Sequence, residues 1–272
     1  MRSLATRTVP LVLCVISSLL VTAQSTEPEE ARLAKIRASY DAPFQRNLGP
    51  FDCAVQFDWN HHLTTTFGSV PPAIVPVIER LQKIQRRVLV DRREAVVSQN
   101  PKVSDLSSFP AAATLEFGLE SMVAAGLNSW LPYATNVILP VSPTSYHFET
   151  AGSDTKLTMN GPGVSATLSL LPDGRLTGGL SDKPQPLHFA TEFTSGPQGF
   201  LLSSMKVGSG NSGAFESSFA YHYETVDGFQ LPTHFTVRSL IAPASAELWE
   251  IELQDCKVNR SMTIQVNPPL HQ

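Results

Sequence analysis

The 272-residue sequence lacks the short motifs that define the common classes of enzyme. It contains no Gly-x-Ser-x-Gly, no phosphate-binding loop, no His-Glu-x-x-His and no Cys-x-x-Cys. Charged residues make up only 16% of the chain, and the formal net charge is −4 without a basic run, which argues against binding to nucleic-acid phosphates. We therefore expect a non-enzymatic protein with no cofactor, no bound metal and no nucleic-acid partner.

Two partial matches to catalytic motifs are better explained by chance. Gly208 to Gly213 has the spacing of a dinucleotide-binding loop, but strand-like alternation follows it where that motif requires a helix. Ser-x-x-Lys occurs at 153–156 and at 203–206, in strand-like segments whose residues three apart point to opposite faces. Neither match therefore predicts a nucleotide-binding or catalytic site.

His61 and His62 are the first histidines that could take part in chemistry. They are adjacent, so their side chains diverge in most backbones, and only Asp58 lies nearby. Three protein ligands are the minimum for catalytic zinc and four for structural zinc, so a metal site is not expected here.

His222 and His234 lie in one expected hairpin. Asp227-Gly228 is a two-residue signature of a type I′ turn, and with this loop His222 faces Thr233. The two imidazoles would then lie on opposite faces of the sheet and could not share a metal.

The N-terminal segment predicts export. Arg2 and Arg7 precede an apolar stretch at 11–21 that is much too short to span a bilayer as an ordinary helix. Val21-Thr22-Ala23 places small residues at a cleavage position, so we expect a signal peptide over 1–23 and a soluble periplasmic or secreted protein. A retained N-terminal anchor is the alternative.

Two of the three cysteines lie near the ends of the single domain expected over 24–272. In an oxidising compartment Cys53 and Cys256 would form a disulfide that stabilises the fold by about 4–5 kcal/mol. The alternation of side chains between the two faces of a strand argues mildly against this disulfide, because Cys53 falls on the apolar side of its strand whereas Cys256 shares a side with Glu250 and Glu252. Two unpaired thiols are the alternative.

The domain is expected to begin with a helix over 27–40, with Thr26 as its cap and Pro28 in its first turn. Alternating apolar residues over 51–59 then predict a strand with one buried face.

A helical insertion is expected over about 70–135. Apolar residues at helical spacing predict a helix over 74–88, although β-branched residues allow a strand over 87–97 instead. A second helix, over 108–131 with Ser107 or Ser108 as cap, is unusually apolar, and Glu116 and Glu120 are its only charges. A helix of this kind is buried on most sides or covers an apolar surface.

The remaining sequence predicts an antiparallel meander. Short alternating segments are separated by turn residues, and successive strands with short connections pair as neighbours. The expected strands are 164–171, 175–180, 187–193, 200–207, 215–226, 229–238 and 247–258. In the hairpin over 215–238 we expect one face to carry Phe219, Tyr221 and Tyr223, and the other to carry Val226, Phe229, Leu231 and Phe235.

The C-terminal third resembles the periplasmic carriers of outer-membrane lipoproteins and their lipoprotein-sorting relatives. The resemblance rests on Tyr-x-x-x-Asp-Gly-Phe-x-Leu-Pro-x-x-Phe at 223–235 and on Leu-Trp-Glu-Ile-Glu-Leu at 248–253, and it is specific over about 215–259. It implies an incomplete β-barrel with helices over its open side. We therefore expect an α+β, mainly β fold, in which an antiparallel meander forms a curved half-barrel with an N-terminal helix and two inserted helices.

The leading functional hypothesis is a carrier for a lipid, an acyl chain or a lipoprotein, bound in an apolar concavity beneath the helix at 108–131. The candidate ligand-binding residues are Leu115, Leu119, Met122, Trp130, Tyr221 and Tyr223. One alternative is a structural or interaction protein of the cell envelope, in which this helix fills the core. A second is a hydrolase of envelope polymers, which would require Asp58, His61 or His62 to meet another polar group in a cleft.

Overall fold

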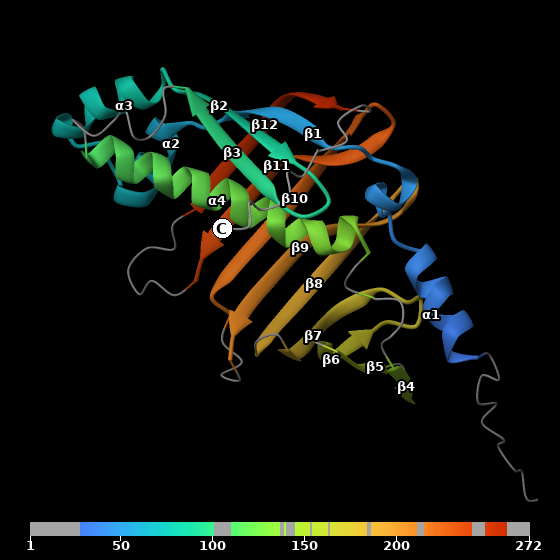
Figure 1. Cartoon of the computed structure of the whole chain (residues 1–272). Helices are drawn as coiled ribbons and strands as arrows, with labels where there is room; N and C mark the ends of the chain where they lie inside the picture. The colour runs from blue at the N-terminus through green and yellow to red at the C-terminus, as the bar shows by residue number, and fades with distance from the viewer. Residues whose placement is uncertain are drawn as a thin grey trace, which may run out of the picture.

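A computed structural model describes residues 28–100, 110–136, 139, 145–152, 154–162, 164–183, 186–210, 215–240 and 248–259. Within these ranges the chain forms one twelve-stranded antiparallel sheet with helices, so the predicted curved, mainly β fold of class α+β is confirmed (Figure 1). The expected signal peptide and the caps expected at Thr26, Ser107 and Ser108 lie outside the described residues.

The helices and strands alternate only in the first half of the chain. The helices are α1 (Glu29–Ala38), η1 (Pro43–Arg46), α2 (Trp59–Phe67), η2 (Pro72–Ile74), α3 (Val75–Leu81) and α4 (Pro110–Ala134). The strands are β1 (Phe51–Gln56), β2 (Gln85–Val90), β3 (Ala95–Asn100), β4 (Ser145–Ala151), β5 (Asp154–Gly161), β6 (Val164–Leu170), β7 (Leu176–Lys183), β8 (Leu187–Gly196), β9 (Gly199–Ser209), β10 (Ser217–Val226), β11 (Phe229–Ser239) and β12 (Leu248–Val258). Among the described helices, none is long and apolar enough to cross a membrane.

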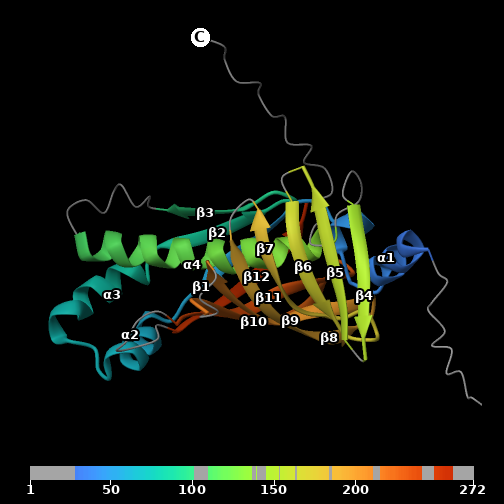
Figure 2. The same ribbon diagram turned by 90° about the horizontal axis from the view of Figure 1, so that it is seen from below.

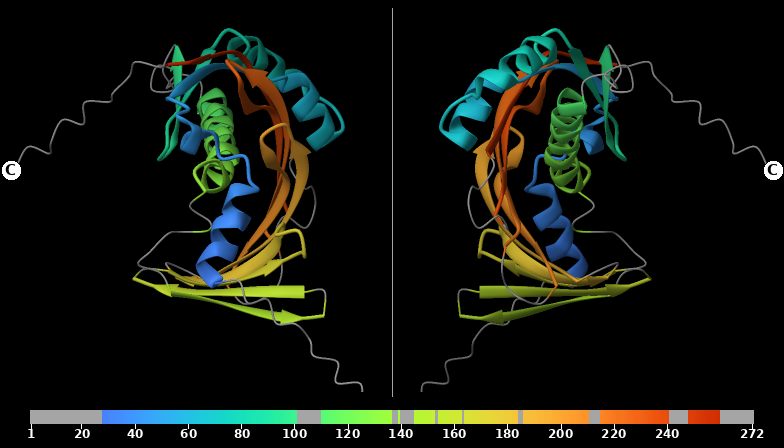
Figure 3. Two further views of the ribbon diagram at one scale, coloured as in Figure 1. Left: turned by 90° about the vertical axis from the view of Figure 1, so that its right-hand side faces the viewer. Right: turned by 90° about the vertical axis from the view of Figure 1, so that its left-hand side faces the viewer.

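The strand order explains where α4 lies. The sheet runs β3-β2-β1-β12-β11-β10-β9-β8-β7-β6-β5-β4, so β3 and β4 are its two edges and α4 connects them. At 1.5 Å per residue, the 25 residues of α4 extend about 37 Å. The end-on views of Figure 3 show the sheet curving around α4 and α1, with the far edge of the half-barrel open. Figure 2 shows α2 and α3 together at the end where α4 begins.

The first strand ends earlier than the alternation over 51–59 predicted. β1 stops at Gln56, and Asp58 begins α2 by accepting a hydrogen bond from the backbone N–H of His61. Trp59 is fully buried as expected, but from the first turn of this helix rather than from a strand. The alternation at 51–59 concealed the start of the helix, because Trp59 continues the pattern of an apolar residue at every second position, which is typical of a strand.

The helix predicted over 74–88 is also shorter than expected. α3 ends at Leu81. The segment beyond it is extended, but the single strand expected as the alternative over 87–97 is instead two strands, β2 and β3, separated by a turn at 91–94. The carboxylate of Asp91 accepts the backbone N–H groups of Arg93 and Glu94 in the turn, which stabilises the hairpin. In the N-terminal helix, Pro28 occupies the cap position rather than the first turn.

The predicted disulfide between Cys53 and Cys256 is confirmed and joins β1 to β12. Cys256 lies on the same side as Cys53, contrary to the simple alternation along β12, because the two strands contain a β-bulge between the pairs Asp52–Lys257 and Ala54–Gln254. Asp255 is the extra residue, with a φ of 48° that Asp tolerates better than most residues. The bulge turns Cys256 to the side of Cys53.

A second bulge corrects the register of the β10–β11 hairpin. Asp227 and Gly228 have φ of 50° and 86°, as a type I′ turn requires. Past the turn, Thr233 is an extra residue on β11, so His222 pairs with His234 and Tyr221 pairs with Phe235. Tyr221 and Phe235 therefore share the buried face, contrary to the expectation that they lie on opposite faces.

Close packing of α4 on the sheet depends on Gly126. A Cβ atom there would lie 2.3 Å from the ring of Phe235, which is fully buried. We expect Gly126→Ala to lower the free energy of unfolding by about 1–2 kcal/mol, because overpacking costs about 1–3 kcal/mol and outweighs the gain of up to about 1 kcal/mol in helix propensity. Chemical denaturation measures the change.

Gly118→Ala is the matched control in the same helix. Its Cβ would meet only the outer edge of Trp249, at 3.2 Å, so its stability should equal or exceed that of the parent protein. Equal effects of the two substitutions would contradict the packing of α4 described above.

Candidate functional site

The concave face of the sheet is the first candidate site, and α4 occupies it. The six residues predicted to bind a ligand all belong to or pack against the apolar core between α4 and β10. Leu119, Trp130 and Tyr221 are buried, whereas Leu115, Met122 and Tyr223 are partly buried. The structure thus brings the predicted residues together, but packs them against protein atoms.

Tyrosine hydroxyls in the core make hydrogen bonds to backbone groups, and that of Tyr221 reaches α4. Tyr221 donates to the carbonyl of Gly126 in α4, and Tyr223 donates to the carbonyl of Leu202 in β9. Tyr40 donates to the carbonyl of Gly174 and accepts from the N–H of Leu176. Each hydroxyl is satisfied within the protein, as buried polar groups generally are.

Burial raises the pKa of these phenols. The pKa of Tyr40 rises to about 12, and those of Tyr133, Tyr221 and Tyr223 also rise, in each case chiefly because the phenolate would lose its hydration. The neutral hydroxyl is therefore the form that fits the interior.

These pKa shifts predict loss of stability at high pH. The unfolded tyrosines ionise near pH 10, whereas Tyr40 in the folded protein ionises near 12, so its contribution is complete below pH 10 and is lost between pH 10 and about 12. Absorbance of tyrosinate and circular dichroism, recorded together against pH, should change in one transition. Ionisation of all tyrosines before any loss of structure would contradict the burial of these phenols.

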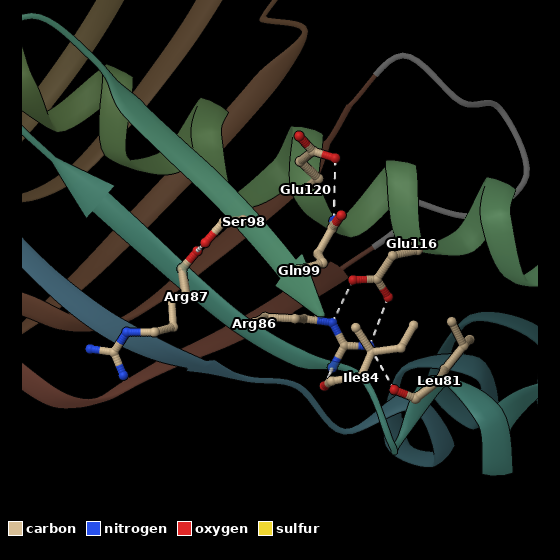
Figure 4. Close-up of polar contacts among 8 residues, drawn as sticks. All are labelled: Leu81, Ile84, Arg86, Arg87, Ser98, Gln99, Glu116 and Glu120. Carbon is tan, nitrogen blue, oxygen red and sulfur yellow. Dashed lines mark hydrogen bonds and ion pairs between the residues drawn. The ribbon is translucent and has the colours of Figure 1, made fainter. Parts of the chain in front are cut away.

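A buried ion pair connects α4 to the sheet (Figure 4). The side chains of Arg86 in β2 and Glu116 in α4 are only 5% and 1% exposed. Arg86 Nε lies 2.6 Å from Glu116 Oε1, and one terminal nitrogen lies 2.7 Å from Oε2, which makes the pair bidentate. Arg86 also donates to the carbonyls of Ile84 and Leu81, so its charge is well solvated by protein groups.

Such a pair is an unusual way to hold an apolar helix. Buried ion pairs are often no more stabilising than apolar residues of the same volume, so stability alone does not account for this one. Among the described residues, Glu120, the other charge of α4, accepts a long hydrogen bond of 3.3 Å from Gln99. Both glutamates are evident in the sequence as the only charges of an apolar helix, but no sequence pattern identifies Arg86 as the partner of Glu116.

The convex face carries a second candidate site, a polar cleft of about 610 Å³ between α2 and β12. Its outer strand residues alternate with the buried Trp249, Ile251 and Leu253, which places them on the convex side. The cleft is lined by Gln56, Phe57, Asp58, Asn60, His61, His62, Thr65, Gln82, His234, Leu248, Glu250, Glu252 and Gln254.

Asp58, His61 and His62, the residues that the hydrolase alternative requires, therefore meet other polar groups in this cleft. His61 Nε2 lies 3.6 Å from Glu250 Oε2, with both side chains about half exposed. Asp58 caps α2, and the buried His62 places Nδ1 3.0 Å from the carbonyl of Leu248. His61 and Glu250 are both exposed and therefore accessible to a ligand in this cleft.

The other suggestive sequence patterns do not form sites. Gly210 lies in the turn after β9, and β10 is the next element among the described residues, so no helix follows the glycine pattern as a nucleotide loop requires. Ser203 and Lys206 lie on strand β9, and Ser153 lies outside the described residues.

Comparison with known proteins adds no assignment: no protein-family model, no curated protein and no solved structure matches the chain.

Proposed function

We propose that the protein carries an apolar chain, such as the acyl chain of a lipid or lipoprotein, on the concave face of its sheet, and that the ligand takes the place of α4. The observation that supports this most is the placement of an apolar crossover helix inside an open half-barrel. Both contacting surfaces are apolar, so an acyl chain could bury the same sheet surface at about 0.8 kcal/mol per methylene.

The Arg86–Glu116 pair holds α4 in one position on the sheet before a ligand replaces it. An apolar contact alone could slide, whereas a bidentate pair fixes one position of α4. The proposed export from the cytosol and the resemblance of 215–259 to lipoprotein carriers favour the same function, because lipids crossing an aqueous compartment need such a carrier.

Titration of the mature protein with a fluorescent fatty acid tests the proposal. The parent protein should bind the probe saturably, and native mass spectrometry should show one or a few bound chains. Glu116→Gln weakens the docked state of α4, so it should raise the affinity at least about tenfold, which corresponds to 1.4 kcal/mol less work to displace the helix.

Glu120→Gln is the matched control, since Glu120 lies on the same helix but its hydrogen bond with Gln99, at 3.3 Å, is longer than those of Glu116 with Arg86. It should bind like the parent protein. Absence of saturable binding in both the parent and Glu116→Gln would refute the carrier function and favour a structural role in which α4 is permanent core.

The convex cleft supports a second candidate function, hydrolysis of an envelope polymer. The specific observation is that Asp58, His61 and His62 meet Glu250 and other polar groups in one cleft. Release of soluble fragments from purified cell-wall polymer, abolished by Glu250→Gln but unaffected by Glu116→Gln, would support this function over the carrier.

A further inference from the structure

The corrected register of the β10–β11 hairpin places two histidines side by side on the convex face. His222 and His234 are directly paired, and their neighbours Tyr221 and Phe235 point into the core. The two imidazole centroids lie 5.3 Å apart, with 19° between the ring planes. His222 is exposed and His234 is partly buried.

This spacing is the one that a shared metal ion requires. A Zn–N bond is about 2.0–2.1 Å long, so two imidazoles bound to one tetrahedral zinc have centroids about 5 Å apart. The ring planes must turn out of their near-parallel arrangement to aim one nitrogen each at the ion. That is a rotation about χ2, which is broad and soft for histidine.

A carboxylate lies next to the pair. Glu252 on β12 is the register partner of His234, so His222, His234 and Glu252 follow one another across three strands. The cleft next to α2 and a neighbouring cleft of about 600 Å³ are both lined by His234 and Glu252. The neighbouring cleft also includes Glu224 and Asp255. Among the described residues that line the two clefts, all side chains that carry a full charge at neutral pH are carboxylates, which favours a cation there.

We propose that His222 and His234 bind a divalent transition-metal ion of the zinc class beside the two clefts that His234 lines, with Glu252 as a third ligand and water completing the coordination. Imidazole ligands suit zinc, copper and nickel, whereas magnesium and calcium prefer oxygen ligands. Among the described residues, no three His, Cys, Asp or Glu side chains are already grouped to hold a metal ion, so Glu252 must turn toward the histidines on binding. The proposal is independent of lipid binding.

Isothermal titration of untagged, chelator-treated protein with zinc chloride tests the site. We expect one ion per chain, and His222→Ala and His234→Ala should each weaken binding at least about tenfold, since even outer-shell partners of metal ligands are worth 10–100-fold. Glu252→Gln should weaken it by a smaller factor. His147→Ala is the matched control, because His147 also lies on a strand and pairs with a carboxylate, that of Glu29, and it should bind like the parent protein.

Three outcomes would overturn the proposal. Magnesium binding as tight as zinc binding would mean that the acidic surface alone attracts cations. Equal loss in His61→Ala and in the two ligand variants would place the ion at the His61–Glu250 pair instead. No measurable heat with zinc, from protein whose circular dichroism is that of the folded state, would mean that the histidine pair binds no metal.

Discussion

Removal of the Cys53–Cys256 disulfide is expected to lower the free energy of unfolding by about 5 kcal/mol. The bond joins residues 203 positions apart, and the chain-entropy model gives a larger effect for longer loops. It also fixes β12, the last strand of the meander, to β1, the first strand of the chain, where the two pair in the sheet. Cys53→Ala/Cys256→Ala, rather than a serine pair, avoids placing a hydroxyl at the fully buried position of Cys53.

Denaturant unfolding of this double variant and of the oxidised parent protein measures the effect. The reduced parent protein is the control and should unfold at nearly the same denaturant concentration as the variant. A loss below about 1 kcal/mol in both would mean that the unfolded chain is already constrained without the bond.

Loss of one partner of the Arg86–Glu116 pair is expected to cost about 3–5 kcal/mol, because the other charge stays buried without its counter-ion. Arg86→Ala leaves the Glu116 carboxylate nearly inaccessible to water. The double variant Arg86→Met/Glu116→Leu should recover most of the lost stability, since apolar side chains of similar size can replace a buried pair.

Arg87 provides the matched control for Arg86. It is the next residue on β2 and points away from the Arg86–Glu116 pair (Figure 4). It pairs with Asp52, and its side chain is 44% exposed. Arg87→Ala should cost less than about 1 kcal/mol, as exposed pairs generally do. Equal losses in Arg86→Ala and Arg87→Ala, measured by chemical denaturation, would contradict the burial of the pair.

The sequence predicted the sheet well because its local signals agreed with one another. Asp227-Gly228 placed the β10–β11 turn, and alternation placed each strand that follows Val164. What it could not predict were the two bulges at Asp255 and Thr233. A single extra residue reverses every later side chain, and neither residue is diagnostic of a bulge on its own. Both register-dependent errors, the side of Cys256 and the histidine faces, follow from these two positions.

The candidate site was predicted in part. The apolar character of α4 and its two glutamates were evident from the sequence, and their location on the concave face follows from α4 connecting the two sheet edges. The partner of Glu116 lies 30 residues earlier in a segment expected to be helical, so no local pattern could have identified Arg86. Asp58, His61 and His62 were candidates from the sequence, but α2 was not predicted beyond Trp59, so their meeting with Glu250 in the convex cleft could not be placed.

The most direct test of the proposed carrier function is whether α4 moves when a lipid binds. Spin labels at Phe117→Cys on α4 and Leu180→Cys on β7 report the distance between α4 and the sheet, because both native side chains are exposed and Cys53 and Cys256 are paired with each other. With a bound acyl lipid, the label–label distance should change by about 10 Å, the diameter of the helix that must leave the concave face. An unchanged distance distribution in lipid-saturated protein would show that α4 stays in the core, and the proposed exchange of α4 for a ligand would be wrong.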